Sequence, residues 1–227
     1  MRMRRKKHLD ERIELSSKYL LFFEPRSVYG RPNKENYPNI DVKAVFGNDN
    51  PIYLEIGSGK GSFICQMAQK NPQNNYIAVE KDDNVMVSAM ELASSMGLEN
   101  VKFVICGAEQ LDFLFSANSF DGLYLNFSCP FPKGTYANRR LTNPKFLRVY
   151  QTLLKNGAKI FQKTDNRPFF EYSLESYKEC NLNATDVTFD LYKSEFLDGN
   201  VATEYETKFV SIGKPICRAV VVIDKAL

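Results

Sequence analysis

Apolar and polar positions alternate along the chain in a regular way from residue 51 onward. Short apolar runs rich in Val, Ile, Leu and Tyr predict buried strands. Between these runs, apolar residues recur three and four positions apart, which predicts helices. Strands are expected at residues 51–56, 75–80, 101–106, 120–126, 158–163, 185–192 and 216–223, and helices at 62–71, 82–96, 143–155 and 167–180.

This alternation is typical of an α/β fold, with a mostly parallel sheet and helices on both faces. The pair Asn156-Gly157 is expected to end the helix before it, because Gly readily takes the left-handed conformation at a helix C-terminus. Residues 13–50 show weak periodicity and are rich in Pro and Asn. We therefore expect a basic N-terminal arm over residues 1–50 and a single domain over residues 51–227, a length that can bury one substantial core.

Composition excludes several classes of protein. A membrane span needs about 20 apolar residues, and no apolar run comes near that length. No signal-peptide pattern follows the basic N-terminus. The five cysteines are scattered without a C-x-x-C pair, which favours free thiols in the reducing cytoplasm over disulfides or a zinc site. His8 is the only histidine, so we expect no His-ligated metal and no catalysis by a histidine.

Positive charge is concentrated in two segments, although the formal net charge is only +3. Residues 1–12 carry six Lys or Arg against two acidic residues, and residues 122–164 carry eight Lys or Arg with no Asp or Glu. Aromatic residues are interleaved in the second segment. This distribution favours a nucleic acid as partner, with rings that can stack on unpaired bases. The alternative is a solvated basic face above ordinary core aromatics.

The segment that carries the most information is the loop Gly57-Ser58-Gly59-Lys60-Gly61 between the first strand and the first helix. Its glycines allow a tight turn and let a ligand approach the backbone, at the position where open α/β sheets bind nucleotides. The spacing differs from the G-x-G-x-x-G of dinucleotide sites. Glu55 precedes the loop, and an acid there suits a ligand with a cationic amino group. A glycine turn without a ligand is the alternative.

Two further positions lie at the ends of predicted neighbouring strands. Glu80 ends the second strand, 19 residues after Gly61, and its carboxylate can accept hydrogen bonds from the two hydroxyls of a ribose. Gly107 follows the third strand, where an adenine would lie. This prediction depends on the position of Gly107 alone and not on its residue type.

Five ordered motifs give the chain a specific resemblance. They are Leu-Glu-Ile-Gly-Ser-Gly-Lys-Gly at 54–61, Asn-Phe-Ser-Cys-Pro-Phe-Pro-Lys at 126–133, Arg-Arg-Leu at 139–141, Thr-Asp-Asn at 164–166 and Thr-Glu-Tyr-Glu-Thr-Lys-Phe at 203–209. In this order and spacing they resemble the bacterial tRNA (guanine-N7)-methyltransferases over nearly the whole chain. The resemblance implies a Rossmann-like class I methyltransferase fold with a seven-stranded sheet whose last strand is antiparallel. It also implies S-adenosyl-L-methionine as cofactor and a guanine in the variable loop of tRNA as substrate.

The resemblance also implies roles for individual residues. The cofactor contacts fall on Glu55, Gly57, Gly59, Glu80, Gly107 and Cys129, and the substrate contacts on Lys133, Asp165, Thr203, Glu204, Tyr205 and Glu206. The family carries an acid, usually assigned as catalytic, where this chain has Cys129, and a Trp where it has Phe131. Its acidic or amide residue at the end of the third strand is Gly107 here.

Two other functions remain open at this point. A tRNA-binding paralogue with impaired catalysis is favoured by the altered loop around Cys129, while intact Lys133 and Asp165 count against it. An NAD-dependent oxidoreductase is disfavoured by the glycine spacing and by the absence of a Tyr-x-x-x-Lys pair. The sequence is compatible with a monomer or a homodimer.

Overall fold

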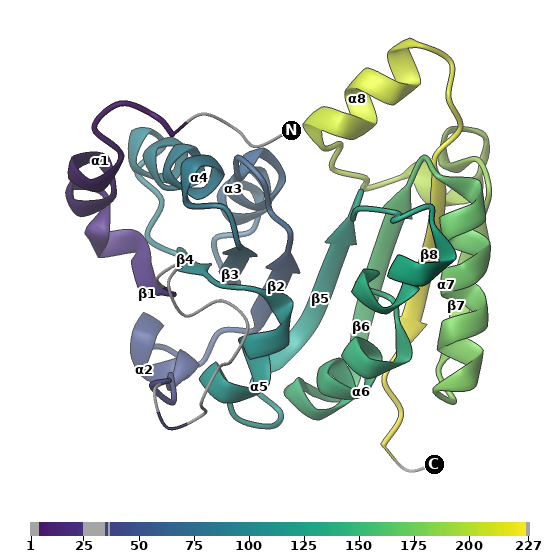
Figure 1. The fold of residues 1–227 in the computed structure, drawn as a ribbon, viewed down its shortest axis with the longest axis horizontal. Coiled ribbons are helices and arrows are strands. Elements are labelled where there is room, and N and C mark those ends of the chain that lie inside the picture. The colour runs from purple at the N-terminus through teal and green to yellow at the C-terminus, as the bar shows by residue number, and fades with distance from the viewer. Residues whose placement is uncertain (1–4, 25–34, 36, 226–227) are drawn as a thin grey trace. The chain divides into compact units, whose positions relative to one another are not determined.

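The computed structural model describes residues 5–24, 35 and 37–225, and its secondary structure follows the predicted alternation closely. The chain divides into two units, Met1–Ser116 and Ala117–Leu227 (Figure 1). Within the described residues, no helix combines the length and the apolar character that a membrane span requires.

The first unit is built on four parallel strands. These are β1 (Leu20–Phe23), β2 (Ile52–Ile56), β3 (Asn75–Glu80) and β4 (Val101–Ile105), in the order β1-β4-β3-β2. Strands β2, β3 and β4 are almost entirely buried, which explains their continuous apolar sequence. In the register of the sheet, Glu55 lies beside Ala78 and Glu80 beside Ile105. Because the strands are parallel, the loops that follow β2, β3 and β4 leave from the same edge.

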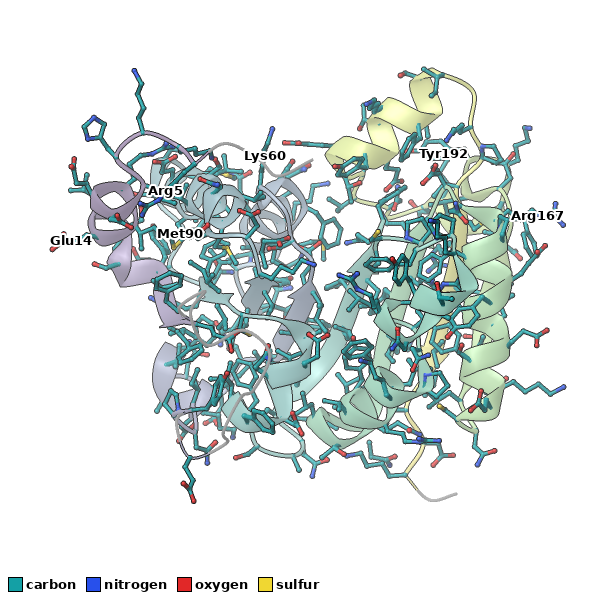
Figure 2. The ribbon with its side chains drawn as sticks, viewed as in Figure 1. Arg5, Glu14, Lys60, Met90, Arg167 and Tyr192 are labelled. Carbon is teal, nitrogen blue, oxygen red and sulfur yellow. The ribbon has the colours of Figure 1, made fainter. Side chains whose placement is uncertain are left out.

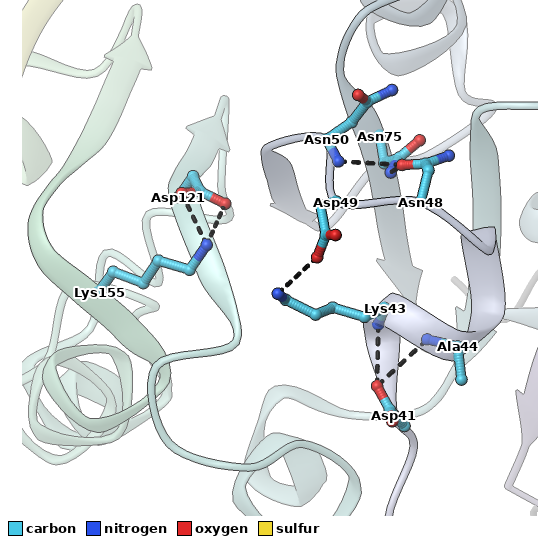
Figure 3. Close-up of polar contacts among 9 residues, drawn as sticks. All are labelled: Asp41, Lys43, Ala44, Asn48, Asp49, Asn50, Asn75, Asp121 and Lys155. Carbon is cyan, nitrogen blue, oxygen red and sulfur yellow. Dashed lines mark hydrogen bonds and ion pairs between the residues drawn. The ribbon is translucent and has the colours of Figure 1, made fainter.

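Helices cover these strands. The first unit contains α1 (Leu9–Leu15), α2 (Val42–Phe46), α3 (Ser62–Lys70), α4 (Asp83–Ser95) and α5 (Leu111–Leu114), with the 3₁₀ turns η1 (Ser17–Tyr19) and η4 (Ala108–Gln110). Helices α3 and α4 pack on each other and on β3 and β4. Asp41 caps α2 by accepting hydrogen bonds from the backbone of Lys43 and Ala44, and Lys43 pairs with Asp49 at 2.7 Å (Figure 3).

The second unit has four strands with one reversal. Its strands are β5 (Phe120–Asn126), β6 (Leu154–Thr164), β7 (Asn183–Thr188) and β8 (Cys217–Val222), in the order β5-β6-β8-β7. Strands β5 and β6 are parallel, and β8 runs antiparallel to both β6 and β7, as expected for the last strand. Lys155 of β6 forms an ion pair with Asp121 of β5 at 2.8 Å (Figure 3).

The helices of this unit lie beside and beyond the strands. They are α6 (Pro144–Leu153), α7 (Arg167–Glu179) and α8 (Glu204–Ser211), with the 3₁₀ turns η5 (Gly134–Arg139), η6 (Leu191–Lys193) and η7 (Glu195–Leu197). Helices α6 and α7 contact each other and β6. Figure 1 shows α8 beyond the arrowheads of β5 and β6, at the edge where ligands of parallel sheets bind.

The structure corrects three expectations. The described residues form eight strands, one more than the seven expected, because the apolar run Leu20–Phe23 pairs with the outer edge of β4. The helix expected to end at Asn156-Gly157 ends at Leu153, since buried Leu154 already pairs with Phe120 in the sheet. Gly157 does have a positive φ of 78°, but it lies within β6 and donates to the carbonyl of Ile223.

The third correction concerns the later strands. The strand expected over 185–192 ends at Thr188, because buried Leu191 turns inward in η6 and donates its N–H to Ile216. Helix α8 was not expected at all.

Candidate functional site

In the first unit, the glycine loop joins β2 to α3 with three left-handed residues. Gly57, Gly59 and Gly61 have φ values of 79°, 58° and 78°, which any other residue adopts only under strain. A Cβ at Gly61 would lie 2.6 Å from the Cβ of Ala89, so this glycine allows α4 to pack against the loop. A Cβ at Gly57 or Gly59 would meet nothing within 4 Å, which leaves open space for a ligand at the backbone. Lys60 is exposed and extends away from the ribbon (Figure 2).

The loop is tied to the neighbouring strand. Gly57 and Ser58 both donate backbone hydrogen bonds to the carbonyl of Val79, at 2.8 and 3.2 Å. Glu80, the next residue, accepts from the N–H of Gly59 at 3.3 Å through Oε2 and from Lys81 at 2.8 Å through Oε1. These contacts fix the carboxylate of Glu80 beside the glycine loop.

Glu55 lies at the end of β2 and is 2% exposed. Burial, with the nearby Glu55 carboxylate, raises the pKa of the Cys65 thiol to about 12, so this cysteine stays neutral at physiological pH. Gly107 follows β4 in an ordinary extended conformation, with φ −78°. The predicted cofactor residues of this unit therefore lie at the ends of three adjacent strands.

In the second unit, the loop after β5 holds strained aromatic residues. Phe127 and Phe131 have φ values of 50° and 40°, which is unusual for bulky residues. Phe127 donates its N–H to the carbonyl of Lys163 at 2.8 Å. Such strain persists only where surrounding contacts enforce it, and it is frequent at functional sites. The thiol of Cys129, in the middle of this loop, is exposed.

Two arginines support this loop. Arg140 donates to the carbonyls of Pro130 and Phe131 at 2.9 and 3.0 Å. The guanidinium of Arg139 lies 4.9 Å from the ring centre of Phe131 and 5.7 Å from that of Tyr136. Arg140 therefore orders the loop, a role that the sequence did not reveal, because there Arg140 was only a positive charge and part of the Arg-Arg-Leu motif.

Lys133 and Asp165 lie in different surroundings. Lys133 is exposed at the start of η5, where its ammonium group is accessible to a polyanion. Asp165 follows β6, and its carboxylate forms an ion pair of 2.9 Å with Lys214. The ammonium group of Lys214 also lies 4.6 Å from the ring centre of Phe209 in α8, so Lys214 connects Asp165 to that helix.

The run from Thr203 to Glu206 forms the first turn of α8 and separates into buried and exposed residues. Thr203 and Glu206 form a capping box, in which each side chain accepts a hydrogen bond from the backbone of the other. Glu204 and Tyr205 face solvent, and Tyr205 is 60% exposed. The Tyr205 ring stacks near Phe127 at 6.4 Å between ring centres, so the loop after β5 and α8 meet through aromatic rings.

A buried carboxylate anchors α8 to the sheet. Glu206 is fully buried and forms an ion pair of 2.5 Å with Lys163 of β6. Its other oxygen accepts from Asn200 at 2.6 Å and from Tyr192 at 3.2 Å. Burial, followed by the nearby Glu206, raises the pKa of Tyr192. Lys163 thus pairs with a carboxylate in the protein interior, although in the sequence it belongs to the basic segment that favours a nucleic acid as partner.

The basic N-terminus also makes internal contacts. Arg12 binds Glu91 of α4 through two hydrogen bonds of 2.6 and 2.7 Å, and Lys6 bonds to Asn84 and Ser88 of the same helix. Arg5 pairs with Asp10. Arg2 and Arg4 lie outside the described residues. Part of the predicted basic arm therefore stabilises the packing of α1 on α4.

Nowhere among the described residues does a group of three or more His, Cys, Asp or Glu have the geometry to hold a metal ion. All five cysteines are free thiols.

Known proteins resemble this chain throughout. A family model described as a putative methyltransferase matches residues 49–219. A tRNA (guanine-N(7)-)-methyltransferase of Listeria monocytogenes is 43% identical over 207 residues, which cover 87% of this chain and 96% of that protein. The enzyme of the same name from Bacillus licheniformis is 43% identical over 218 residues, covering 96% and 97%.

The solved structures agree on the fold. The crystal structure of the 16S rRNA methyltransferase KamB has a TM-score of 0.61 at 16% identity, over 83% of this chain and 94% of that one. The fold is the Rossmann-like α/β fold of class I methyltransferases. With this fold, a matching family model and relatives 43% identical over almost their whole length, the chain belongs to the tRNA (guanine-N7)-methyltransferase family.

Proposed function

We propose that this protein transfers a methyl group from S-adenosylmethionine to N7 of a guanine in the variable loop of tRNA. The observation that carries the proposal is the 43% identity to proteins named for this reaction, over nearly the whole chain. The glycine loop beside Glu80 supports it independently, because this arrangement suits a nucleoside-like cofactor.

The residues of the first unit fit S-adenosylmethionine. Gly57 and Gly59 present open backbone, Glu80 can accept hydrogen bonds from the ribose hydroxyls, and Glu55 supplies negative charge for the amino group of the methionine part. Gly107 marks the end of β4, on the adenine side. The bound cofactor supplies an activated methyl group on a sulfonium ion.

Residues of the second unit fit a tRNA. The exposed Lys133 can bind phosphate, and the exposed Glu204 and Tyr205 can contact a nucleotide, Tyr205 by stacking. Asp165 can accept hydrogen bonds from the guanine edge through the oxygen that Lys214 does not hold. Thr203 and Glu206 contribute differently, because their capping box and buried ion pair hold Tyr205 and Glu204 in place.

The replacement of the family's acid by Cys129 does not remove the basis for catalysis. Guanine N7 carries an in-plane lone pair and needs no deprotonation before methylation. Alignment of the two reactants supplies about 7–11 kcal/mol where the geometry is good. A carboxylate that offsets the positive charge developing on the purine is worth about 10²–10³-fold in rate. Cys129 therefore predicts a slower enzyme.

A second candidate is a tRNA-binding paralogue that no longer turns over. The exposed thiol of Cys129, at the position of the family's acid, favours it. The ordered loop counts against it, since Arg140 donates to the carbonyls of Pro130 and Phe131, and Phe131 is kept at a strained φ of 40°.

The proposal extends to the setting of the reaction. We place it in the cytoplasm, where tRNA is found and where five free thiols remain reduced. The arm over residues 1–50, the domain over 51–227, independence of metal ions and a monomeric or homodimeric state remain predictions.

Transfer of tritium from methyl-labelled S-adenosylmethionine to tRNA that lacks this modification tests the proposal. Incorporation that depends on the protein supports the enzyme. Tight tRNA binding without any incorporation, at high protein concentration and long times, would favour the paralogue.

A further inference from the structure

Gly107, at the end of β4, has no side chain at the position where the adenine of the cofactor is predicted to lie. Gly107 stands where the family has an acidic or amide residue, yet the space is not open. A Cβ at Gly107 would lie 2.7 Å from Oε1 of Gln110 and 2.7 Å from Oε2 of Glu109. Two side chains from the following turn, η4, therefore fold back over Gly107, and their oxygens take the place of a side chain at this position.

Of these two oxygens, Oε1 of Gln110 is buried without a hydrogen-bond partner among the described residues. Gln110 is 6% exposed, and among the described residues its Oε1 has no hydrogen-bond partner. Burying an amide oxygen without a partner is costly, and most such groups in native proteins are satisfied by protein, water or a ligand. Glu109 is exposed, so water can solvate its carboxylate.

The surroundings of Gln110 favour a ligand that donates hydrogen bonds. Glu24, 1% exposed at the end of β1, donates its N–H to the carbonyl of Ile105 at 2.8 Å, which places it beside the end of β4. Burial, with added repulsion from Glu24 and Glu109, raises the pKa of the Cys106 thiol, and this residue directly precedes Gly107. The backbone turn at Gly107 is thus bordered by acceptors and negative charge.

Position within the sheet indicates which part of the cofactor lies here. Glu80, the predicted ribose acceptor, is paired with Ile105 across the adjacent strands β3 and β4. Neighbouring strands are about 4.8 Å apart, so the end of β4 lies about one strand spacing away from Glu80 and the ribose that it is predicted to bind. In adenosine, the group attached to the ribose at about this distance is the adenine base. The only hydrogen-bond donor of adenine is its 6-amino group.

We propose that Oε1 of Gln110 accepts a hydrogen bond from the 6-amino group of the adenine of S-adenosylmethionine, in place of the side chain that Gly107 lacks. This inference rests on the proposed cofactor. It assigns the recognition of adenine in this chain to a residue of η4, and it makes Gly107 necessary, because any side chain there displaces the amide of Gln110.

The test measures binding by calorimetry, without turnover, for two ligands. One is S-adenosylhomocysteine; the other is its purine riboside analogue, in which hydrogen replaces the 6-amino group. We expect the wild type to bind the analogue about 10-fold more weakly, the loss of one hydrogen bond to a buried acceptor. In Gln110→Leu, which keeps the bulk of the side chain, the two ligands should bind equally; in Gln110→Glu, which keeps an acceptor, the preference should remain.

Glu109→Gln and Gly107→Ala serve as matched variants. Glu109→Gln should keep the preference for the amino group, whereas Gly107→Ala should reduce it by displacing Gln110. Equal binding of the two ligands by the wild type, or an undiminished preference in Gln110→Leu with an unchanged circular dichroism spectrum, would overturn the inference. Failure of the wild type to bind S-adenosylhomocysteine at all would instead refute the proposed cofactor.

Discussion

The buried pair between Lys163 and Glu206 gives the sharpest prediction about how the sheet supports α8. Replacing Glu206 by Ala removes a carboxylate that accepts hydrogen bonds from Lys163, Thr203, Asn200 and Tyr192. The ammonium group of Lys163 would remain buried, hydrogen-bonded to the oxygen of Asn200 at 3.0 Å and to the carbonyl of Val201 at 2.9 Å. Neither of these carries a charge.

The magnitude follows from this geometry. Breaking a buried ion pair by removing one partner costs about 3–5 kcal/mol, because an uncompensated charge remains in the interior. For a protein of this length, that loss lowers the melting temperature by about 6–20 °C. Urea unfolding followed by circular dichroism measures the free energy, and tRNA affinity measured in parallel reports whether α8 still presents Tyr205.

Two controls make the result interpretable. Glu204→Ala removes a carboxylate two positions earlier that is exposed, so its effect on unfolding should stay below about 0.5 kcal/mol. The double variant Lys163→Met with Glu206→Met removes both charges and should recover much of the stability lost by Glu206→Ala. A loss of unfolding free energy below about 1 kcal/mol in Glu206→Ala would contradict this prediction, since it would mean that the Lys163–Glu206 pair is solvated in solution.

Three further predictions concern the cofactor, the altered loop and the N-terminal helix. Glu80→Ala should weaken binding of S-adenosylmethionine by about 1.5–3 kcal/mol if the carboxylate binds the ribose; unchanged affinity by calorimetry would remove Glu80 from the site. Cys129→Asp should raise single-turnover methylation about 10-fold, because the charge stabilises the developing purinium, while Cys129→Ser should match the wild type; loss of activity in Cys129→Ser would show that the thiol itself is essential. Hydrogen bonding from Arg12 lowers the pKa of Glu91, so their pair stabilises the fold at pH values above the unfolded pKa of Glu, about 4.3, and this stabilisation is lost as the pH falls through the lower folded pKa. Arg12→Ala should therefore lower the free energy of unfolding at pH 7 but change it little at pH 2. An equal loss at both pH values would show that the contact acts through packing.

Local patterns predicted most of the fold. The strands β2 to β5 and the helices α3 and α4 agree with their predicted ranges to within a residue or so, because each has a strong period and clear end signals such as Gly97. Strand β1 was missed because four apolar residues among irregular sequence do not reveal that the edge of β4 will accept them. Helix α8 was missed because its start was considered only as a motif, although Thr203 and Glu206 have the spacing of a capping box.

The candidate site shows a similar division. Glycines and an acid at strand ends were visible in the sequence, since parallel strands bring such positions to one edge. Burial was not visible, and it separates residues that look alike in the sequence. Lys133 and Lys163 belong to the same basic segment, yet one faces solvent and the other neutralises Glu206. Gln110 carried no signal at all, because its position over Gly107 depends on the turn of η4.

Identifying the atom that is methylated is the most direct test of the proposed reaction. An unmodified tRNA transcript with a guanine in its variable loop is incubated with the protein and S-adenosylmethionine, digested to nucleosides and analysed by mass spectrometry. We expect 7-methylguanosine, and no product from a transcript in which 7-deazaguanosine, which lacks N7, replaces that guanosine. Formation of a different methylated nucleoside, or equal methylation of the 7-deaza transcript, would contradict it.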